Sequence, residues 1–473
     1  MTAGLAAVVA PARYIRYADA EPILSELAVT GALPPELGTL TKPQREAAWP
    51  GWIERHDKEI RARLEQGDED TIVNWLLFGT SFTSEPRAIL GAVEGDKPGR
   101  PASPAIPAGA ADRDPIVRRA VELIGARLDD LLDALAKPGT DERRLFARRL
   151  LERKGKRFGT AADLDGVRQY LLGAVMRVAQ EQEQVDQEIG ATSGGDSIAA
   201  FVERSRLFRT RGLSLDTSLL PNYALERSMA AMKERGLLKA GALRRVAIVG
   251  PGLDFADKDV GFDFYPQQTL QPFAVLDSIK RLGLGPPAAS PEIVLLDISP
   301  RVIDHVTKAR ARAVKGLGYT LHLPLSKATP WIPEVRKYWE TFGNQIGAPA
   351  QASASKAILD QVELRAVRAA PGAVARLSVA DVNIVTERLD QEAFDLVIAT
   401  NVFIYYDVLE QALAMANIEA MLKPGAFLLA NVAAPPVRAL TIRPVDTATT
   451  LYARVPNQEN ILDFIVWYQA HAQ

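Results

Sequence analysis

Two short apolar runs, one ending in a glycine turn and the other in an acid, carry the residues that could bind a nucleoside. Val246 to Gly250 has no polar side chain and leads into Gly250-Pro251-Gly252. Glycine lets a backbone turn sharply and approach a ligand without a Cβ in the way. The second run, Ile293 to Leu296, ends on Asp297, and a carboxylate at a strand tip can accept two hydrogen bonds from a ribose diol. The pattern predicts a nucleotide-binding α/β domain.

The spacing after the glycine turn discriminates between possible ligands. A nicotinamide site needs a third glycine three residues after the second, so that the following helix packs on the strand. Phe255 occupies that position. The next helix is expected to begin near Gln267, because apolar residues then recur at a helical interval: Leu270, Phe273, Leu276 and Ile279.

Polar residues gather at the expected start of this helix. Tyr265, Gln267, Gln268 and Thr269 follow one another closely, and a helix N-terminus favours an anionic group. These side chains are predicted to orient a ligand carboxylate, with helix capping as the alternative role.

Five ordered motifs in the C-terminal half resemble those of the class I S-adenosylmethionine-dependent methyltransferases. They are Val246–Gly252, the acid Asp297 followed by Ile298, Val379-Ala380-Asp381-Val382, Phe394–Asn401 and Met421–Ala430. The resemblance implies S-adenosyl-L-methionine as cofactor, bound by Gly250, Gly252, Asp297 and Ile298, with Asp381 and Val382 at the adenine and Thr400 and Asn401 after the fourth strand. Asp254 stands where the family usually has a third motif glycine, and it is included in the predicted cofactor site with Tyr265, Gln268 and Thr269.

The segment after the fourth strand carries the candidates for catalysis. Asn401 to Tyr406 is most similar to the corresponding segment of the chemotaxis-receptor glutamate methyltransferases. Methyl transfer from a sulfonium requires a positioned, deprotonated acceptor. Asn401 and Tyr405 are predicted to contact the acceptor or the methionine end of the cofactor, whereas the alternative for Asn401 is a turn residue at a strand end.

The identity of the acceptor is open at this point. Nucleic-acid amino methylation usually needs Asp/Asn-Pro-Pro-Tyr/Phe after the fourth strand, but Val402-Phe403-Ile404 follows Asn401. A carboxylate, a hydroxyl, another small molecule or a protein are the remaining acceptors. Two other classes also fit the residues: a cofactor-binding scaffold without transfer activity, and an aminopropyl-type transferase using the acids of the 252–266 loop.

Composition excludes several kinds of chemistry. The 473-residue chain contains no cysteine and four histidines, so disulfides, thiolate metal sites and cysteine nucleophiles are excluded and no metal site is expected. The net charge of −2 gives no general attraction to nucleic acid or an anionic membrane. No apolar run approaches the roughly 18–20 residues of a membrane span, and the apolar segment 5–10 lacks a preceding basic residue. A cytoplasmic enzyme is expected.

Periodicity divides the chain near residue 240. Residues 1–240 are predicted to form a large, mainly α-helical N-terminal domain containing a Pro/Gly/Ala-rich linker at 91–111. Before the linker, two separate helical pieces are predicted, over 43–64 and 70–78. Residues 241–473 are predicted to form an α/β domain with a Rossmann-like, seven-stranded, mostly parallel methyltransferase sheet. The aromatic-rich insertion 316–372 is either a substrate lid or a packed helical decoration. Within it, an extra strand is predicted over 319–325 and a helix over 352–367. The basic run 143–157 is interpreted as a solvated helix face, with a phosphate or acidic-partner surface as the alternative.

The long loop between Gly252 and Pro266 carries four acids beside aromatic residues. We predict that it folds over the cofactor and that Tyr265 contacts the ligand. The alternative is that the loop packs on the N-terminal helices.

Overall fold

The computed structural model describes residues 10–88, 115–192, 219–255, 263–390, 393–454 and 460–471, with side chains of 115–117 and 181–192 left out. The linker predicted at 91–111 and the middle of the 252–266 loop therefore lie outside the described residues.

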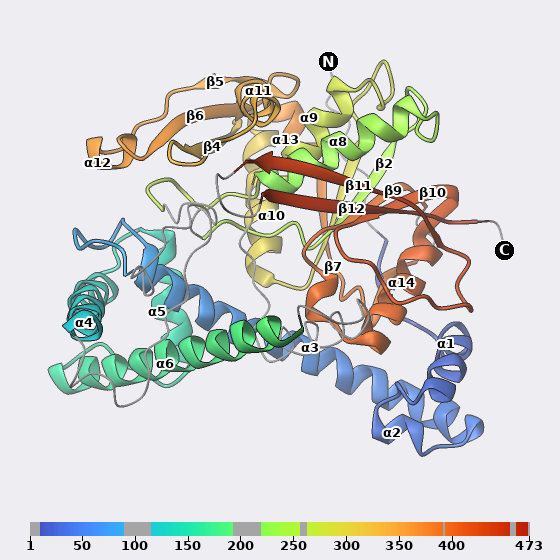
Figure 1. Cartoon of the computed structure of the whole chain (residues 1–473), viewed down its shortest axis with the longest axis horizontal. Coiled ribbons are helices and arrows are strands. Elements are labelled where there is room, and N and C mark those ends of the chain that lie inside the picture. Colours follow the sequence, from blue (N-terminus) through green and yellow to red (C-terminus); the bar gives the residue numbers. More distant parts are fainter. Residues whose placement is uncertain are drawn as a thin grey trace.

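A seven-stranded sheet forms the centre of the C-terminal half, as predicted (Figure 1). Its parallel strands are β2 (Arg245–Val249), β3 (Glu292–Asp297), β7 (Leu377–Asp381), β9 (Phe394–Ala399) and β10 (Leu422–Ala430). β11 (Arg443–Ala453) and β12 (Ile461–Gln469) close it as an antiparallel hairpin. The order is β11-β12-β10-β9-β2-β3-β7. From β2 the chain adds β3 and β7 on one side and then β9 and β10 on the other, so the direction of strand addition reverses between β2 and β9. Ligands of open α/β sheets bind outside the carboxyl ends of the strands at such a point.

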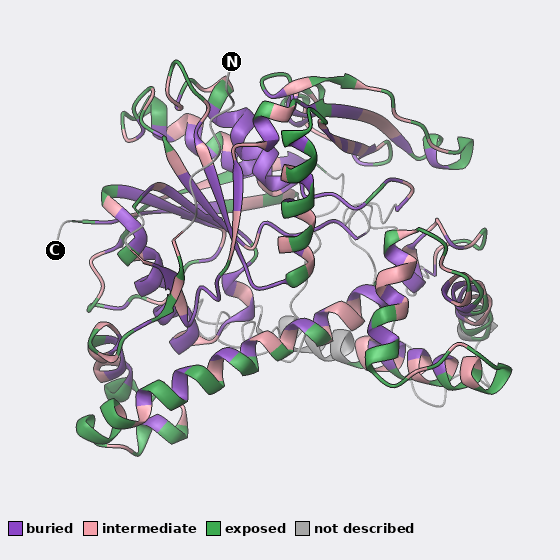
Figure 2. Ribbon diagram, turned by 180° about the vertical axis from the view of Figure 1, so that it is seen from behind, coloured by how far each residue is buried: buried purple, intermediate pink, exposed green. Residues whose placement is uncertain are grey.

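Alternation along the first strand explains the two layers that cover the sheet. Val246 and Ile248 face one hydrophobic core, whereas Ala247 and Val249 face the other. The first core includes α8 (Leu220–Glu234), α9 (Gln271–Arg281) and α10 (Pro300–Val314). The second includes α14 (Val408–Met421) and the N-terminal helices α1 (Tyr17–Thr30) and α2 (Pro35–Gly38). The strands are buried from both sides (Figure 2), which accounts for their uninterrupted apolar runs.

The N-terminal half is mainly helical, as predicted. α3 (Lys42–Phe78) is one helix of 37 residues, where the periodicity suggested two separate pieces. Its first part packs in the core of the sheet, and its last turns pack with α4 (Pro115–Ala136), α5 (Glu142–Arg153) and α6 (Ala161–Thr192). The N-terminal strand β1 (Ala12–Tyr14) also pairs with β8 (Glu387–Leu389). Residues before and after 240 therefore pack in the same core. The division of the chain into two domains near residue 240 stays a prediction.

The insertion 316–372 is a small antiparallel sheet rather than a helical unit. Its strands are β4 (Tyr319–Ser326), β5 (Gly347–Ala350) and β6 (Val362–Ala369), accompanied by α11 (Pro333–Thr341) and the short α12 (Lys356–Leu359) and α13 (Pro371–Val374). The prediction of a helix over 352–367 is wrong. Residues 362–369 contain good helix formers, but pairing with β4 along the whole strand overrides that local preference. Tyr338, Trp339 and Phe342 are buried.

No helix in the parts of the chain that the structure describes is long and apolar enough to cross a membrane.

Candidate functional site

The glycine turn lies where the first strand ends. Gly250 and Gly252 have φ of 60° and 72°, in the left-handed region that favours glycine. The backbone N–H of Gly250 donates to the carbonyl of Leu296, 2.9 Å away. The turn is therefore tied directly to the strand that carries Asp297.

Gly250→Ala is expected to destabilise the protein by about 1–3 kcal/mol, the usual cost of a non-glycine residue held in an unfavourable conformation. A Cβ at this position would also lie 2.9 Å from Val402 Cγ2, so the new methyl group must displace the segment after β9. Urea unfolding measures the loss. Gly372→Ala is the matched control because its φ is not positive and no atom lies within 4 Å of its added Cβ; equal stability of the two variants would contradict this account of Gly250.

Asp297 combines deep burial with an unsatisfied oxygen. The residue is 4% exposed, and its Oδ1 accepts a hydrogen bond of 2.7 Å from the backbone N–H of Ser299. Its Oδ2 is buried and has no hydrogen-bond partner among the described residues. Burial, together with the nearby charge of Asp381, raises the pKa of the Asp297 carboxyl to about 7. An unpaired buried acceptor is costly, so the arrangement suits a ligand that brings hydroxyl donors.

Asp381 and Val382 lie beside Asp297 at the end of the neighbouring strand. Asp297 and Asp381 are register partners in β3 and β7, and the N–H of Val382 donates to the Asp297 carbonyl at 3.1 Å. The Asp381 side chain is largely exposed, and Arg61 of α3 donates to its Oδ1 at 2.7 Å. The next residue after Asp297, Ile298, is 9% exposed. The edge thus presents two carboxylates and two apolar side chains at adjacent positions.

The polar cluster before α9 is largely engaged within the protein. Gln268 Nε2 donates to the carbonyl of His322 at 2.9 Å, and its Oε1 accepts from the His322 N–H at 2.8 Å. The same Nε2 lies 3.3 Å from Asp254 Oδ2. The Tyr265 ring stacks on His322 with centroids 5.4 Å apart. These contacts join the turn, α9 and the insertion strand β4, a long-range role that local sequence does not reveal.

Thr269 has one group engaged within the protein and one without a partner among the described residues. Its N–H donates to the Tyr319 hydroxyl at 2.8 Å, while its Oγ1 is buried without a hydrogen-bond partner among the described residues. The Tyr319 hydroxyl also lies 2.7 Å from His305 Nε2. The hydroxyl has one proton, and its other close partner, the Thr269 N–H, is itself a donor. His305 Nε2 is thus the acceptor within reach, and the hydroxyl is expected to donate its proton to that nitrogen.

The pKa of His305 is therefore expected to be low. Burial and the nearby Arg312 lower it to about 4, and neutral imidazole is the form that accepts from Tyr319. A proton NMR titration of the four histidines, assigned with a His305→Gln variant, should show the His305 resonances unchanged from pH 8 down to about pH 5. Titration of His305 near 6.5 would contradict the hydrogen-bond chain.

Asn401 and Thr400 end the fourth parallel strand. Asn401 has φ of 57° and is exposed. Its N–H donates to Asn431 Oδ1 at 2.8 Å, and its Oδ1 accepts from Asn431 Nδ2 at 2.7 Å. Thr400 Oγ1 accepts from Gln271 Nε2 at 2.7 Å. Asn401 therefore has the geometry of a turn residue at a strand end, which was the alternative to a catalytic role. It also lies at the carboxyl edge of the sheet, as predicted.

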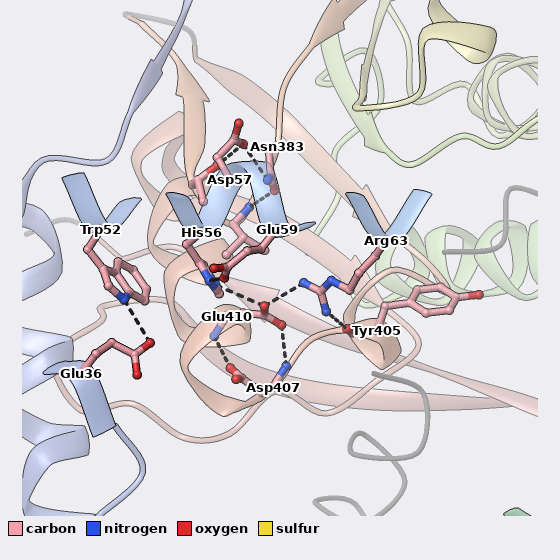
Figure 3. Close-up of polar contacts among 12 residues, drawn as sticks. Glu36, Trp52, His56, Asp57, Glu59, Arg63, Asn383, Tyr405, Asp407 and Glu410 are labelled. Atoms are coloured by element: carbon pink, nitrogen blue, oxygen red, sulfur yellow. Dashed lines mark hydrogen bonds and ion pairs between the residues drawn. The ribbon is translucent and has the colours of Figure 1, made fainter. Parts of the chain in front are cut away.

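Tyr405, the other predicted catalytic residue, lies in the 3-10 turn η1 (Phe403–Tyr405) and is 9% exposed. Its carbonyl accepts from Arg63 Nη1 at 3.1 Å. In Figure 3 its ring points away from the polar contacts around Glu410.

The contribution of α3 to this edge was missed by sequence reasoning. Arg61 contacts Asp381, Arg63 contacts Glu410, and Asp68 accepts from Arg301 Nη1 at 2.9 Å. Each pair joins α3 to a residue hundreds of positions away in sequence, and no local pattern signals such a pairing. α3 thus lies across the carboxyl edge of the sheet, next to α6 (Figure 1).

The first two arginines of the basic run at 143–157 make structural contacts, whereas Arg149, Arg153, Lys154 and Arg157 are exposed, as a solvated helix face would have them. Arg143 is buried and donates to the carbonyls of Phe255 and Tyr265, and Arg144 donates to the carbonyl of Ser81. Asp263 accepts from Thr80 and Ser81 at the end of α3. Both described ends of the 252–266 loop therefore pack on the N-terminal helices, as the alternative interpretation expected. The remainder, 256–262, lies outside the described residues.

Comparison with known proteins finds similarity in solved structures alone. No protein-family model and no curated protein matches the chain. The glycopeptide N-methyltransferase MtfA, complexed with S-adenosyl-L-methionine, aligns over 54% of this chain and 69% of its own at 13% identity and a TM-score of 0.23. A TehB-like SAM-dependent methyltransferase from Corynebacterium glutamicum aligns over 62% and 99% at 9% identity and a TM-score of 0.25. The N-methyltransferase NodS from Bradyrhizobium japonicum aligns over 57% and 98% at 12% identity and a TM-score of 0.25. With scores this low, the fold assignment rests on the sheet itself.

Proposed function

We propose that this protein is an S-adenosyl-L-methionine-dependent methyltransferase. The observation that carries the proposal is the buried, unpaired Asp297 Oδ2, at the end of the strand beside two left-handed glycines in a seven-stranded, mostly parallel sheet. A ribose diol would satisfy that oxygen. Asp381 and Val382 would border the adenine. The absence of a third motif glycine, with Phe255 buried against Trp75, disfavours a dinucleotide.

When bound, the cofactor would supply an activated methyl group on a sulfonium. The residues of this chain have the task of positioning and of excluding water. Gly250 and Gly252 would let the backbone approach the ligand, Asp297 would hold the ribose, and Asn401 and Tyr405 would border the acceptor. α3 covers this edge, so an acceptor would enter between the helices and the sheet. The proposed acceptors are a carboxylate, a hydroxyl, another small molecule or a protein, and the proposed location is the cytoplasm.

Of the two other classes, the aminopropyl transferase is disfavoured by one contact set. It needs the loop acids Asp257, Asp259 and Asp263 to line a polyamine pocket. Asp263 is occupied by five hydrogen bonds from Trp75, Thr80 and Ser81, and Asp257 and Asp259 lie outside the described residues. The observation that points to a scaffold without transfer activity is that the Asn401 side-chain Oδ1 already accepts from Asn431 Nδ2. Activity measurement separates the scaffold from the enzyme.

The test is transfer of label from S-adenosyl-[methyl-¹⁴C]methionine to an extract divided into protein and small-molecule fractions. The proposal predicts time-dependent labelling of one fraction by the wild-type protein and none by Asp297→Ala. Binding of S-adenosylhomocysteine without labelling of either fraction would support the scaffold instead. Absence of binding would overturn both.

A further inference from the structure

The turn between β9 and α14 is held from two sides. Within its own segment, Tyr405 N–H donates to the Val402 carbonyl at 3.2 Å. Gln411 Nε2 of α14 donates to the carbonyls of Phe403 and Tyr406, at 3.0 and 2.8 Å. The carbonyl of Tyr405, which precedes that of Tyr406 along the chain, is held by the N-terminal half of the protein.

Arg63 of α3 provides this second attachment (Figure 3). Its Nη1 donates to the Tyr405 carbonyl at 3.1 Å, and its Nη2 donates to Glu410 Oε1 at 2.7 Å. The guanidinium also lies 5.9 Å from the centroid of the Tyr406 ring. One planar group therefore spans the turn and the first turn of the helix that follows it, and the fixed fork of a guanidinium suits this double role.

Glu410 is a rigid anchor for that guanidinium. It is 1% exposed, and its Oε2 accepts from the Asp407 N–H at 2.9 Å, while Asp407 Oδ1 accepts from the Glu410 N–H at 2.8 Å. This reciprocal capping box fixes the start of α14. His56 Nε2 lies 3.2 Å from Glu410 Oε1 on the other side. Burial would raise the pKa of Glu410, but His56 and Arg63 outweigh it and lower the pKa to about 2, so the anchor stays ionised.

We propose that Arg63 is a positioning residue that fixes the 401–406 segment against the cofactor site, so that the N-terminal helices complete the site for the acceptor. The proposal rests on the methyltransferase function proposed above. Arg63 touches neither cofactor nor acceptor in this account; it acts through the Tyr405 backbone. Arg61, two residues earlier on the same helix, reaches Asp381 instead, so the two arginines hold different parts of the edge.

The Arg63→Lys variant distinguishes a positioning role of Arg63 from simple charge pairing with Glu410. In Arg63→Lys one ammonium could still pair with Glu410 but would not hold the Tyr405 carbonyl in the same geometry, because a lysine is a point charge without a bidentate fork. Arg63→Gln leaves Glu410 with His56 as its remaining cationic neighbour and tests loss of both contacts. Arg61→Gln is the matched control.

The first experiment needs no ligand. Amide hydrogen exchange of the unliganded protein should be at least tenfold faster at Tyr405 and Tyr406 in both Arg63→Lys and Arg63→Gln, with Arg61→Gln like the wild type at these amides. Unchanged exchange in Arg63→Gln would overturn the proposal. If Arg63→Gln fails to fold, the exchange of Arg63→Lys decides the question. Exchange at Tyr405 and Tyr406 equal to that of the wild type would mean that Arg63 only pairs with the charge of Glu410, and it would overturn the positioning role.

The second experiment separates binding from transfer. With S-adenosylhomocysteine as the probe, calorimetry should give Arg63→Lys a Kd within about twofold of the wild type, whereas its rate of ¹⁴C-methyl transfer to the labelled fraction should fall at least tenfold. A methyl-transfer rate of Arg63→Lys equal to that of the wild type would overturn the proposal. Failure of the wild-type protein to bind the probe would instead overturn the proposed function, and the exchange result in the unliganded protein would still decide whether Arg63 positions the turn.

Discussion

Asp297→Ala is expected to weaken binding of S-adenosylhomocysteine by about 1–3 kcal/mol, or about 5- to 150-fold in Kd. The carboxylate is the proposed acceptor for the ribose hydroxyls, and its Oδ2 has no hydrogen-bond partner among the described residues. Isothermal calorimetry measures the change. Asp304→Ala is the matched control, since that carboxylate is exposed on α10 and pairs with Lys308. Equal affinity of Asp297→Ala and the wild type would remove Asp297 from the site.

The pH dependence of binding provides a second signature of the same residue. The pKa of Asp297 in the unliganded protein is raised to about 7, and donors from a diol favour the ionised form. Binding should therefore release a proton below pH 7, with affinity falling by up to about tenfold per pH unit below that value and levelling above it. Asp297→Asn should abolish this dependence. Because the folded pKa is raised, the free energy of unfolding without ligand should decrease as pH rises from about 4 to 7.

Asp263→Ala is expected to lower the free energy of unfolding by about 2–4 kcal/mol. Asp263 is 2% exposed and accepts from the Trp75 indole and from the backbone and hydroxyl groups of Thr80 and Ser81. Burial would raise its pKa, but these donors and Arg143 lower it. Removing the carboxylate leaves the buried Trp75 indole N–H and the half-buried donors of Thr80 and Ser81 without their acceptor, and an unsatisfied buried donor is a recognised cause of large losses.

Urea unfolding, followed by tryptophan fluorescence, measures this loss. Asp263→Asn should lose less, because the amide oxygen can still accept. Asp360→Ala, at an exposed pair with Lys356, should leave the urea midpoint unchanged. A midpoint for Asp263→Ala equal to that of the wild type would show that the loop does not depend on its attachment to α3.

Local sequence predicted the sheet because each parallel strand is buried on both faces. Runs such as Val246–Val249 and Ile293–Leu296 therefore show as uninterrupted apolar segments, and the residues at their ends, Gly250 and Asp297, follow by position. The number of strands and their mostly parallel arrangement were predicted, whereas the order β11-β12-β10-β9-β2-β3-β7 comes from the folded chain.

Long-range pairings were not accessible in this way. Arg61 and Asp381 are 320 residues apart, and nothing in the helical periodicity of α3 shows that one of its faces meets the sheet edge. The position of Gln268 beside a helix start predicts a cofactor contact, yet its side-chain amide forms hydrogen bonds with the backbone of His322. The residues of β6 have helical propensity and so predict a helix, and their pairing with β4 becomes visible in the folded chain alone.

Native mass spectrometry of the purified protein with S-adenosylhomocysteine, and in parallel with NAD⁺, tests whether Asp297 holds the ribose of a methyltransferase cofactor. We expect one equivalent of S-adenosylhomocysteine bound to the wild-type chain, a much smaller fraction bound to Asp297→Ala, and no specific NAD⁺ adduct. Binding of NAD⁺ in preference to S-adenosylhomocysteine, or equal occupancy in Asp297→Ala and the wild type, would contradict it.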